Sequence, residues 1–427
     1  MKPSLGLPGR VVLGLVVLVL LFAGWVVWRN LPADEREAER PLDLTHAAVI
    51  ARGEYLARAG NCMGCHTTRG GTPFAGGRGI ETPFGTIYAP NLTPDPETGL
   101  GAWTADDFWR AMHDGRGRDG RLLYPAFPYP NYTHVTREDT DAIYAYLRSL
   151  PPVQQPRREH ELRFPYSLQA SLAVWRALYF TPRGLEPEAD KPPAWNRGRY
   201  LVEGLGHCMA CHASRDALGG ALDSGGSLMP NGKWYAPSLH ARHQAGVAQW
   251  ETADVVALLK TGVSRKASVM GPMAEVVFYS TQYLSEDDLR AMAVYLQALP
   301  QEEPPPPLSP RELEEQRADA VVLDLGRRVY EQQCASCHGD RGSGQASAYP
   351  ALAGNRAVLV TPPHNVIQAI LWGGFTPTTA GNPRPYGMPP FGHVLNDQEV
   401  AAVATYIRQS WGNQAPAVTS LQVSRAR

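Results

Sequence analysis

The sequence predicts a mostly α-helical protein in which three small helical domains stand in series behind one N-terminal transmembrane helix. A similar unit occurs three times along the chain, and each unit begins and ends with the pattern of a helix. An uncharged apolar run lies near the N-terminus. A chain of 427 residues is also too long for one ordinary domain, since domains average about 150 residues.

The repeated unit is clearest at its two ends. Unit one opens with GEYL at residues 53–56 and closes with YAYLRSLP at 144–151, and unit two opens with GRYL at 198–201 and closes with VYLQALP at 294–300. Unit three opens with GRRVY at 326–330 and closes with VATYIR at 403–408. Capping residues precede the three closing helices, at Thr136, Ser285 and Asn396.

The repeat and the linkers give the expected domain organisation. Pro151 and Pro152 begin the first junction, and Pro304 to Pro307 predict a stiff second one. The expected parts are an anchor (1–30), domain one (45–151), a linker with an amphipathic helix (152–195), domain two (196–300), a proline-rich linker (301–320), domain three (321–413) and a tail (414–427).

Each unit contains one pair of cysteines followed at once by a histidine. The three motifs are Cys62-Met63-Gly64-Cys65-His66, Cys208-Met209-Ala210-Cys211-His212 and Cys334-Ala335-Ser336-Cys337-His338. This is the spacing of c-type haem attachment, in which two thiols add to the vinyl groups of one porphyrin and the imidazole binds the iron from the same side. A disulfide, a zinc site or a redox dithiol would explain one such motif. Three motifs that use all six cysteines predict three haem c groups, with His66, His212 and His338 as proximal ligands.

The sixth ligand of each iron is predicted from methionines in proline-containing loops. Met273 in unit two and Met388 in unit three stand before the closing helix, where a thioether would raise the potential of the haem, and Met270 is the alternative in unit two. The competing interpretation is a methionine that fills the core. The expected position of both methionines, in a loop beside prolines, favours ligation of the iron.

Unit one has no methionine at the corresponding place. Met273 follows Cys208 by 65 positions, and the same count from Cys62 reaches Phe127, whose ring cannot coordinate iron. Met112, His113 and His134 are the nearby candidates, each with an ordinary structural interpretation, and an open or water-ligated iron is the further alternative.

The N-terminal apolar run determines the expected location. Residues 11–28 carry no charge and as a helix would extend about 27 Å, against a hydrocarbon core of about 30 Å. Lys2 and Arg10 precede the run, so the positive-inside bias places the amino end in the cytoplasm and the haem domains in the periplasm. No small-residue cleavage site follows, which favours an uncleaved anchor in a bacterial inner membrane over a signal peptide.

Composition excludes several function classes. Lys and Arg number 40 against 41 Asp and Glu, so no basic field predicts a nucleic-acid partner. Gly70, Gly71 and Gly76 follow a haem motif rather than joining a strand to a helix, so no nucleotide-binding fingerprint is present. Residues 164–180 form an amphipathic segment too short to span a membrane, either a linker helix packed on the haem domains or a helix lying on the bilayer or a partner.

Five further segments carry a family resemblance. They are residues 82–92 (TPFGTIYAPNL), 123–129 (LYPAFPY), 270–277 (MGPMAEVV) and 388–391 (MPPF) with the late 411–413 (WGN). With the three haem motifs, they make the chain resemble the triheme cytochrome c subunits of bacterial membrane-bound periplasmic dehydrogenases, including those for alcohol, gluconate and sugars and molybdenum aldehyde-type enzymes. In that family methionine often stands where this chain has Phe127.

The resemblance implies an electron-transfer subunit with no catalytic residues of its own. The partner would be a membrane-bound catalytic subunit that uses flavin, pyrroloquinoline quinone or molybdopterin, and the acceptor would be ubiquinone or a terminal oxidase. Two alternatives stay open: an independent carrier between quinol and an oxidase, and a haem peroxidase or gas-binding protein that uses an open haem in domain one.

Overall fold

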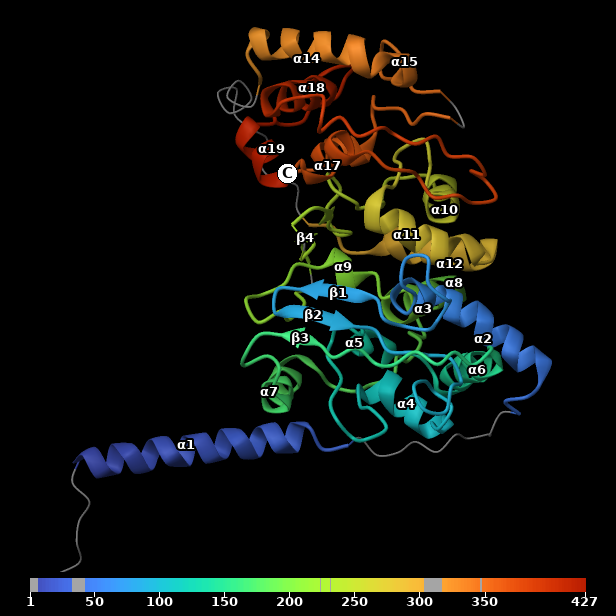
Figure 1. Cartoon of the computed structure of the whole chain (residues 1–427), viewed down its shortest axis with the longest axis vertical. Coiled ribbons are helices and arrows are strands. Elements are labelled where there is room, and N and C mark those ends of the chain that lie inside the picture. The colour runs from blue at the N-terminus through green and yellow to red at the C-terminus, as the bar shows by residue number, and fades with distance from the viewer. Residues whose placement is uncertain (1–6, 33–42, 223, 231, 303–316, 346–347) are drawn as a thin grey trace, which may run out of the picture.

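The described part of the computed structural model comprises residues 7–32, 43–222, 224–230, 232–302, 317–345 and 348–427. It is mostly helical, and the three repeats follow one another along the long axis of the molecule, with helix α1 extending sideways from one end (Figure 1). The predicted helical class and the N-terminal apolar helix are therefore confirmed. We call residues 45–151, 196–300 and 321–413 units one, two and three. Their separation into domains stays a prediction, and the linker around Pro304 to Pro307 lies outside the described residues.

The helices lead into and close each unit. Helix α1 (Leu7–Arg29) is long and apolar enough to cross a membrane by length and composition. Unit one contains α2 (Ala47–Ala59), α3 (Cys62–Cys65), α4 (Ala105–Asp114), α5 (Tyr129–Tyr132) and α6 (Arg137–Ser149), and α7 (Gln169–Tyr179) follows it. Unit two is formed by α8 (Pro193–Arg199), the π-helix η1 (Tyr200–Leu205), α9 (Met209–His212), α10 (Thr252–Thr261), α11 (Gly271–Tyr279), the 3₁₀-helix η2 (Thr281–Tyr283) and α12 (Glu286–Ala298). Unit three is formed by α14 (Ala320–Gln333), α15 (Ala335–His338), α16 (Arg356–Leu359), α17 (His364–Trp372) and α18 (Asp397–Gln409), followed by α19 (Ser420–Ala426).

The strands of the described residues form two small antiparallel sheets. In the first, β2 (Gly85–Tyr88) lies between β1 (Gly79–Thr82) and β3 (Glu161–Leu162). Gly79 pairs with Tyr88, and Gly85 pairs with Leu162. The second sheet pairs β4 (Ser227–Leu228) with β5 (Tyr235–Ala236). Because β3 belongs to the linker that follows unit one, its pairing with β2 holds this linker against unit one.

The opening and closing helices of every unit cross at a glycine. The glycine allows the two backbones to touch, because an added Cβ atom would overlap a carbonyl oxygen of the partner helix. The distances from this Cβ to the oxygen would be 1.8 Å for Gly53 and Ala142, 2.0 Å for Gly198 and Ala291, and 2.2 Å for Gly326 and Ala402. A tyrosine four residues after each of these alanines covers the crossing: Tyr146, Tyr295 and Tyr406.

The predicted caps of the closing helices are confirmed. The Thr136 and Ser285 hydroxyls accept hydrogen bonds from the backbone N–H groups of Asp139 and Asp288. Asn396 forms a reciprocal capping box with Glu399. These bonds satisfy backbone donors that have no partner within the helix, which fixes where each closing helix begins.

The chain between the crossing glycine and the first cysteine differs in length among the units. Cys334 is eight residues after Gly326, Cys62 is nine after Gly53 and Cys208 is ten after Gly198. Helix α14 runs straight to its cysteine, whereas unit one inserts Asn61 in a left-handed conformation. Unit two adds the π-helix η1 and a positive φ at His207. A π turn absorbs one extra residue without breaking the helix, so the motif still reaches its place.

Units one and two are joined by two equivalent hydrogen bonds, in each of which a tyrosine of one unit donates to an aspartate of the other. The Tyr55 hydroxyl of unit one donates to Asp288 Oδ2 at 2.6 Å, and Arg197 donates to the same carboxylate with two bonds of 2.8 Å. The reciprocal set consists of Tyr200, whose hydroxyl donates to Asp139 Oδ2 at 2.6 Å, and Arg52, whose Nε donates to Asp139 Oδ1 at 2.9 Å. The two units therefore form a pair with local two-fold pseudo-symmetry.

Unit three does not repeat these bonds. Leu325 and Arg328 stand where units one and two have the arginine and the tyrosine. Unit three instead contacts unit two through Asn365, whose side chain bonds both the N–H and the carbonyl of Tyr235 at 2.8 Å. The predicted tail also packs on unit three, since Val423 is fully buried in its core.

Replacing Gly53 by alanine should destabilise the protein although alanine favours helices. The added methyl would meet the Ala142 carbonyl, and overpacking of this kind costs about 1–3 kcal/mol. Gly184→Ala is the matched control, because nothing lies within 4 Å of its Cβ position. Denaturant unfolding of both variants measures the effect. Equal stability of Gly53→Ala and wild type would contradict the tight crossing.

Candidate functional site: three repeated cysteine–histidine turns

Each motif forms one short helical turn directly after an opening helix. The histidine N–H donates to the carbonyl of the first cysteine of its motif in all three: 3.0 Å for His66 and Cys62, 3.0 Å for His212 and Cys208, and 2.9 Å for His338 and Cys334. The turn brings both thiols and the imidazole of a motif to one local surface. This is the arrangement that a thioether-linked porphyrin needs.

A proline carbonyl orients each of the three histidine rings. Nδ1 lies 2.8 Å from the Pro90 oxygen in His66, 2.7 Å from the Pro237 oxygen in His212 and 3.0 Å from the Pro350 oxygen in His338. A carbonyl oxygen can only accept, so Nδ1 must carry the proton and Nε2 keeps a free lone pair. Such a bond on the distal nitrogen fixes the tautomer and the ring direction of a metal-binding histidine.

Burial sets the protonation of these groups. It lowers the pKa of His66 to about 4, and it also lowers the pKa of His212 and His338. It raises the pKa of the first thiol to about 12 at Cys62, Cys208 and Cys334. The imidazoles are therefore neutral at physiological pH, which is the form that binds metal.

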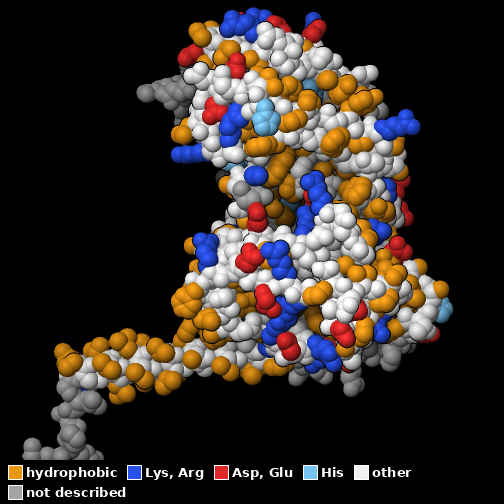
Figure 2. All heavy atoms as spheres, in the orientation of Figure 1, with side chains coloured by type: hydrophobic (Ala, Val, Ile, Leu, Met, Phe, Trp, Pro, Cys, Tyr) orange, Lys and Arg blue, Asp and Glu red, His pale blue; other side chains and the backbone are white. Residues whose placement is uncertain are grey.

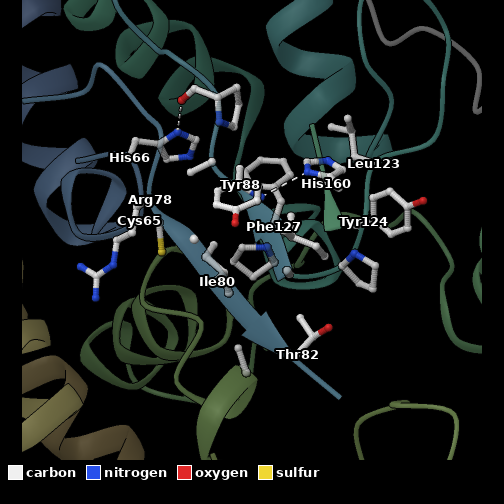
Figure 3. Close-up of a pocket in the computed structure, with 18 of the residues that line it drawn as sticks. Cys65, His66, Arg78, Ile80, Thr82, Tyr88, Leu123, Tyr124, Phe127 and His160 are labelled. Carbon is white, nitrogen blue, oxygen red and sulfur yellow. Dashed lines mark hydrogen bonds between the residues drawn. The ribbon is translucent and has the colours of Figure 1, made fainter. Parts of the chain in front are cut away.

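Units one and two share one large cavity. Its volume is about 2150 Å³, well above the 300–1,000 Å³ or so that suits a single ligand. Cys62, Cys65 and His66 line it from unit one, and Cys211 lines it from unit two. Figure 3 shows the side of the cavity in unit one, where Cys65 and His66 lie across from Phe127 and the strand that carries Ile80. The donor set and the space fit covalently attached haem.

Phe127 and the two predicted methionine ligands lie in different surroundings. Phe127 lines the shared cavity, with its ring 5.3 Å from that of Tyr132. The prediction that Met273 lies in a loop is wrong, because Pro272 and Met273 both lie in the first turn of helix α11. Met273 packs against the joint core of units one and two, but it is not among the residues that line the cavity. Met388 packs on the core of unit three, and its backbone pairs with that of Gly374. Their ligand roles stay predictions.

The three candidates in unit one are not brought together. Met112 is buried and lines the cavity. The His113 ring stacks on Trp109 at 4.4 Å, and Nδ1 of His134 lies 3.2 Å from the Arg183 carbonyl oxygen. Neither histidine is among the residues that line the cavity.

His160 lines the cavity and was not predicted from the sequence. The Tyr88 N–H donates to its Nδ1 at 3.2 Å, and a nitrogen of Arg157 lies 3.4 Å from its Nε2 (Figure 3 shows the Tyr88 bond). Because Nδ1 accepts from the Tyr88 N–H, Nε2 of the neutral ring carries the proton, so neither nitrogen has a free lone pair for iron. No motif marks His160. It reaches the cavity because the segment that carries it pairs with β2.

Comparison with known proteins identifies the family. The Cytochrome c family profile matches residues 50–151 and 323–411. The cytochrome c subunit of the quinone-type alcohol dehydrogenase of Gluconobacter oxydans (strain 621H) is 38% identical over 394 residues, which cover 87% of this chain and 80% of the relative. The chain belongs to the cytochrome c subunits of dehydrogenases.

Two further members of this family support the assignment. The gluconate 2-dehydrogenase cytochrome c subunit of Pantoea cypripedii is 40% identical over 403 residues, covering 90% of this chain and 91% of the relative. The fructose dehydrogenase cytochrome subunit of Gluconobacter japonicus is 34% identical over 443 residues, covering 96% and 87%. Membership implies covalently bound haem c and a role in electron transfer, with catalysis in another subunit.

Replacing both Cys334 and Cys337 by alanine should remove one haem and leave the others, because the thioether links require both thiols. Intact-mass spectrometry of the mature chain checks this. Ser336→Ala, in the same motif, is the control and should lose only the mass of its own substitution. A double variant that loses only the mass of its two substitutions, and no haem, would show that unit three carries no haem.

Proposed function

We propose that this chain carries three haem c groups, one on each cysteine–histidine turn, and passes electrons from a periplasmic dehydrogenase subunit to ubiquinone or a terminal oxidase. One observation carries the proposal. The bond from histidine N–H to cysteine carbonyl and the bond from Nδ1 to a proline carbonyl recur at all three motifs with nearly equal lengths. A bound haem supplies a one-electron iron couple at each place.

The residues of the chain hold and tune these groups. The cysteine pairs would hold the porphyrin covalently, and each proline carbonyl, by accepting from Nδ1–H, would leave Nε2 of its histidine free to bind the iron. Met273 and Met388 are the proposed sixth ligands in units two and three. Both methionines are partly buried against apolar side chains, and a thioether ligand favours the less charged ferrous state.

The paired arrangement of units one and two supports direct electron exchange between them. Cys65 and Cys211, the second thiols of their motifs, line the same cavity. The two tyrosine–aspartate–arginine sets hold the units together, and Arg78 of unit one bonds Glu275 of unit two at 2.6 Å. Two haems attached here would share one enclosure, so an electron would not have to cross bulk water.

The relatives indicate the kind of partner. The cytochrome subunits of alcohol, gluconate and fructose dehydrogenases are named for the enzymes they serve. A catalytic subunit with flavin, pyrroloquinoline quinone or molybdopterin is therefore the proposed electron source. Helix α1 is the proposed anchor in the inner membrane, with the haem-carrying units in the periplasm.

A second candidate function concerns the haem of unit one alone. Phe127 in place of a methionine and His160 in the wall of the cavity favour an iron site that binds a small ligand such as a gas or peroxide. An independent carrier between quinol and an oxidase is the other alternative, and it differs from the main proposal by having no dehydrogenase partner.

Replacing Phe127 by methionine should raise the midpoint potential of one haem, on the order of 0.1 V within the span that axial ligands control. The added thioether should also abolish carbon monoxide binding at that haem. Redox titration and the spectrum of the reduced protein with carbon monoxide measure both. Phe127→Leu is the control and should resemble wild type. If wild type binds no carbon monoxide, the unit-one iron already has a strong sixth ligand.

Purification from membranes in mild detergent tests the main proposal. We expect three haems per chain and a large co-purifying subunit that carries an organic or molybdenum cofactor. The cofactor of that subunit would identify the substrate class. A solitary chain with three haems would contradict the dehydrogenase role and support the independent carrier.

A further inference from the structure

The C-terminal end of α1 is bound to α7. Arg29 donates from Nε to the Ala177 carbonyl at 3.3 Å and from Nη2 to the Phe180 carbonyl at 3.0 Å. Nδ2 of Asn30 donates to the Ala173 carbonyl at 2.9 Å. In Figure 1, α7 stands directly beside the end of α1. The apolar helix is thus not tethered loosely, because its last turn is bonded to a helix of the folded body.

Two buried or half-buried arginines connect this contact to unit one. Arg176 is 4% exposed and donates to the Asn30 side-chain oxygen at 3.1 Å, while Arg116 of unit one donates to the Asn30 carbonyl. The Arg176 guanidinium also lies over the rings of Phe180 and Tyr129, at 4.7 and 5.1 Å. The direction of α1 relative to unit one is therefore fixed by α7.

This contact determines the depth of α7 once α1 is placed in a bilayer. A spanning helix of 23 residues ends at the level of the lipid headgroups, and its terminal arginine marks that level. The carbonyl groups that accept bonds from Arg29 must then lie at the same depth. This step depends on the anchor role proposed above for α1.

Apolar side chains are exposed where α7 would meet lipid. We define the α7 face as Phe164, Tyr166, Leu168, Leu178, Leu218 and Leu222. All six are exposed, from 38% for Tyr166 to 80% for Phe164. Leu218 and Leu222 belong to a loop of unit two that α7 holds through the bonds from Trp175 to the Leu218 carbonyl and from Tyr179 to Asp216. Figure 2 shows hydrophobic side chains on the edge of the body next to the end of α1.

We propose that the α7 face rests in the interfacial layer of the phospholipid bilayer. Exposed leucine and aromatic side chains on a short helix gain stability when they leave water for the boundary between headgroups and acyl chains. Tyr166, Leu178 and Leu218 also line the shared cavity of units one and two. The wall of the cavity at the first haem motif is then in contact with lipid, and the paired units lie against the membrane.

The rate at which a charged, water-soluble maleimide modifies single introduced cysteines tests this placement. The full chain with its haems is reconstituted in nanodiscs of phosphatidylcholine and phosphatidylglycerol, and labelling is followed by mass spectrometry. The variants are Leu168→Cys and Leu222→Cys on the α7 face, neither of which lines the shared cavity, Leu18→Cys in α1, and Phe278→Cys on α11 as control. Phe278 is 40% exposed, against 45% for Leu168 and 48% for Leu222, so exposure in the protein alone predicts that the control reacts most slowly.

The proposal predicts the reverse order. Cysteines at 168 and 222 should react several-fold more slowly than the one at 278, and the one at 18 should not react. Fast labelling at 168 or 222 with protection at 18 would overturn the proposal and leave the anchor intact. Fast labelling at 18 as well would overturn both. Fast labelling that slows only when a dehydrogenase subunit is bound would assign the α7 face to that subunit and overturn the membrane placement.

Discussion

The contact of two helices at a glycine is the constraint on which the rest of each unit depends. Because Gly53, Gly198 and Gly326 have no side chain, the opening helix can touch the closing helix and hold the cysteine–histidine turn at its end in a defined place. The length of the connection from glycine to cysteine varies by one residue from unit to unit. A left-handed residue in unit one and a π-helix in unit two accommodate the added residues. The three units therefore share the helix crossing and the cysteine–histidine turn, but differ in the segment that joins them.

The three sites share one proximal arrangement and differ on the distal side. The proline carbonyl bonds repeat in every unit, whereas the proposed sixth ligands are methionines in units two and three, and Phe127 stands at the corresponding sequence position in unit one. Electron transfer through several haems requires similar attachment but benefits from different potentials, which the protein sets through axial ligands and burial. With the proposed haem on each unit, the departure at Phe127 would change the potential or ligand binding of the first haem but not its covalent attachment through Cys62 and Cys65.

Local patterns in the sequence predicted the parts of the structure that local interactions determine. The helical class, the caps at Thr136 and Asn396 and the apolar helix follow from short-range propensity and hydropathy. Three features could not be predicted from the sequence because they arise from contacts between segments that are distant along the chain. The bonds of Tyr55 and Tyr200 between units one and two, the placement of His160 in the cavity and the bonding of α1 to α7 depend on tertiary packing that no single motif encodes.

We propose that this chain conducts electrons for a separate catalyst and lies against the membrane that supplies the acceptor. Stopped-flow spectroscopy of the purified complex tests this claim most directly, with the substrate of the catalytic subunit added in the absence and presence of a ubiquinone analogue. We expect all three haems to become reduced after substrate is added and to be reoxidised by the quinone within the turnover time. Reduction of the partner's cofactor followed by quinone reduction, with the haems remaining oxidised, would contradict it.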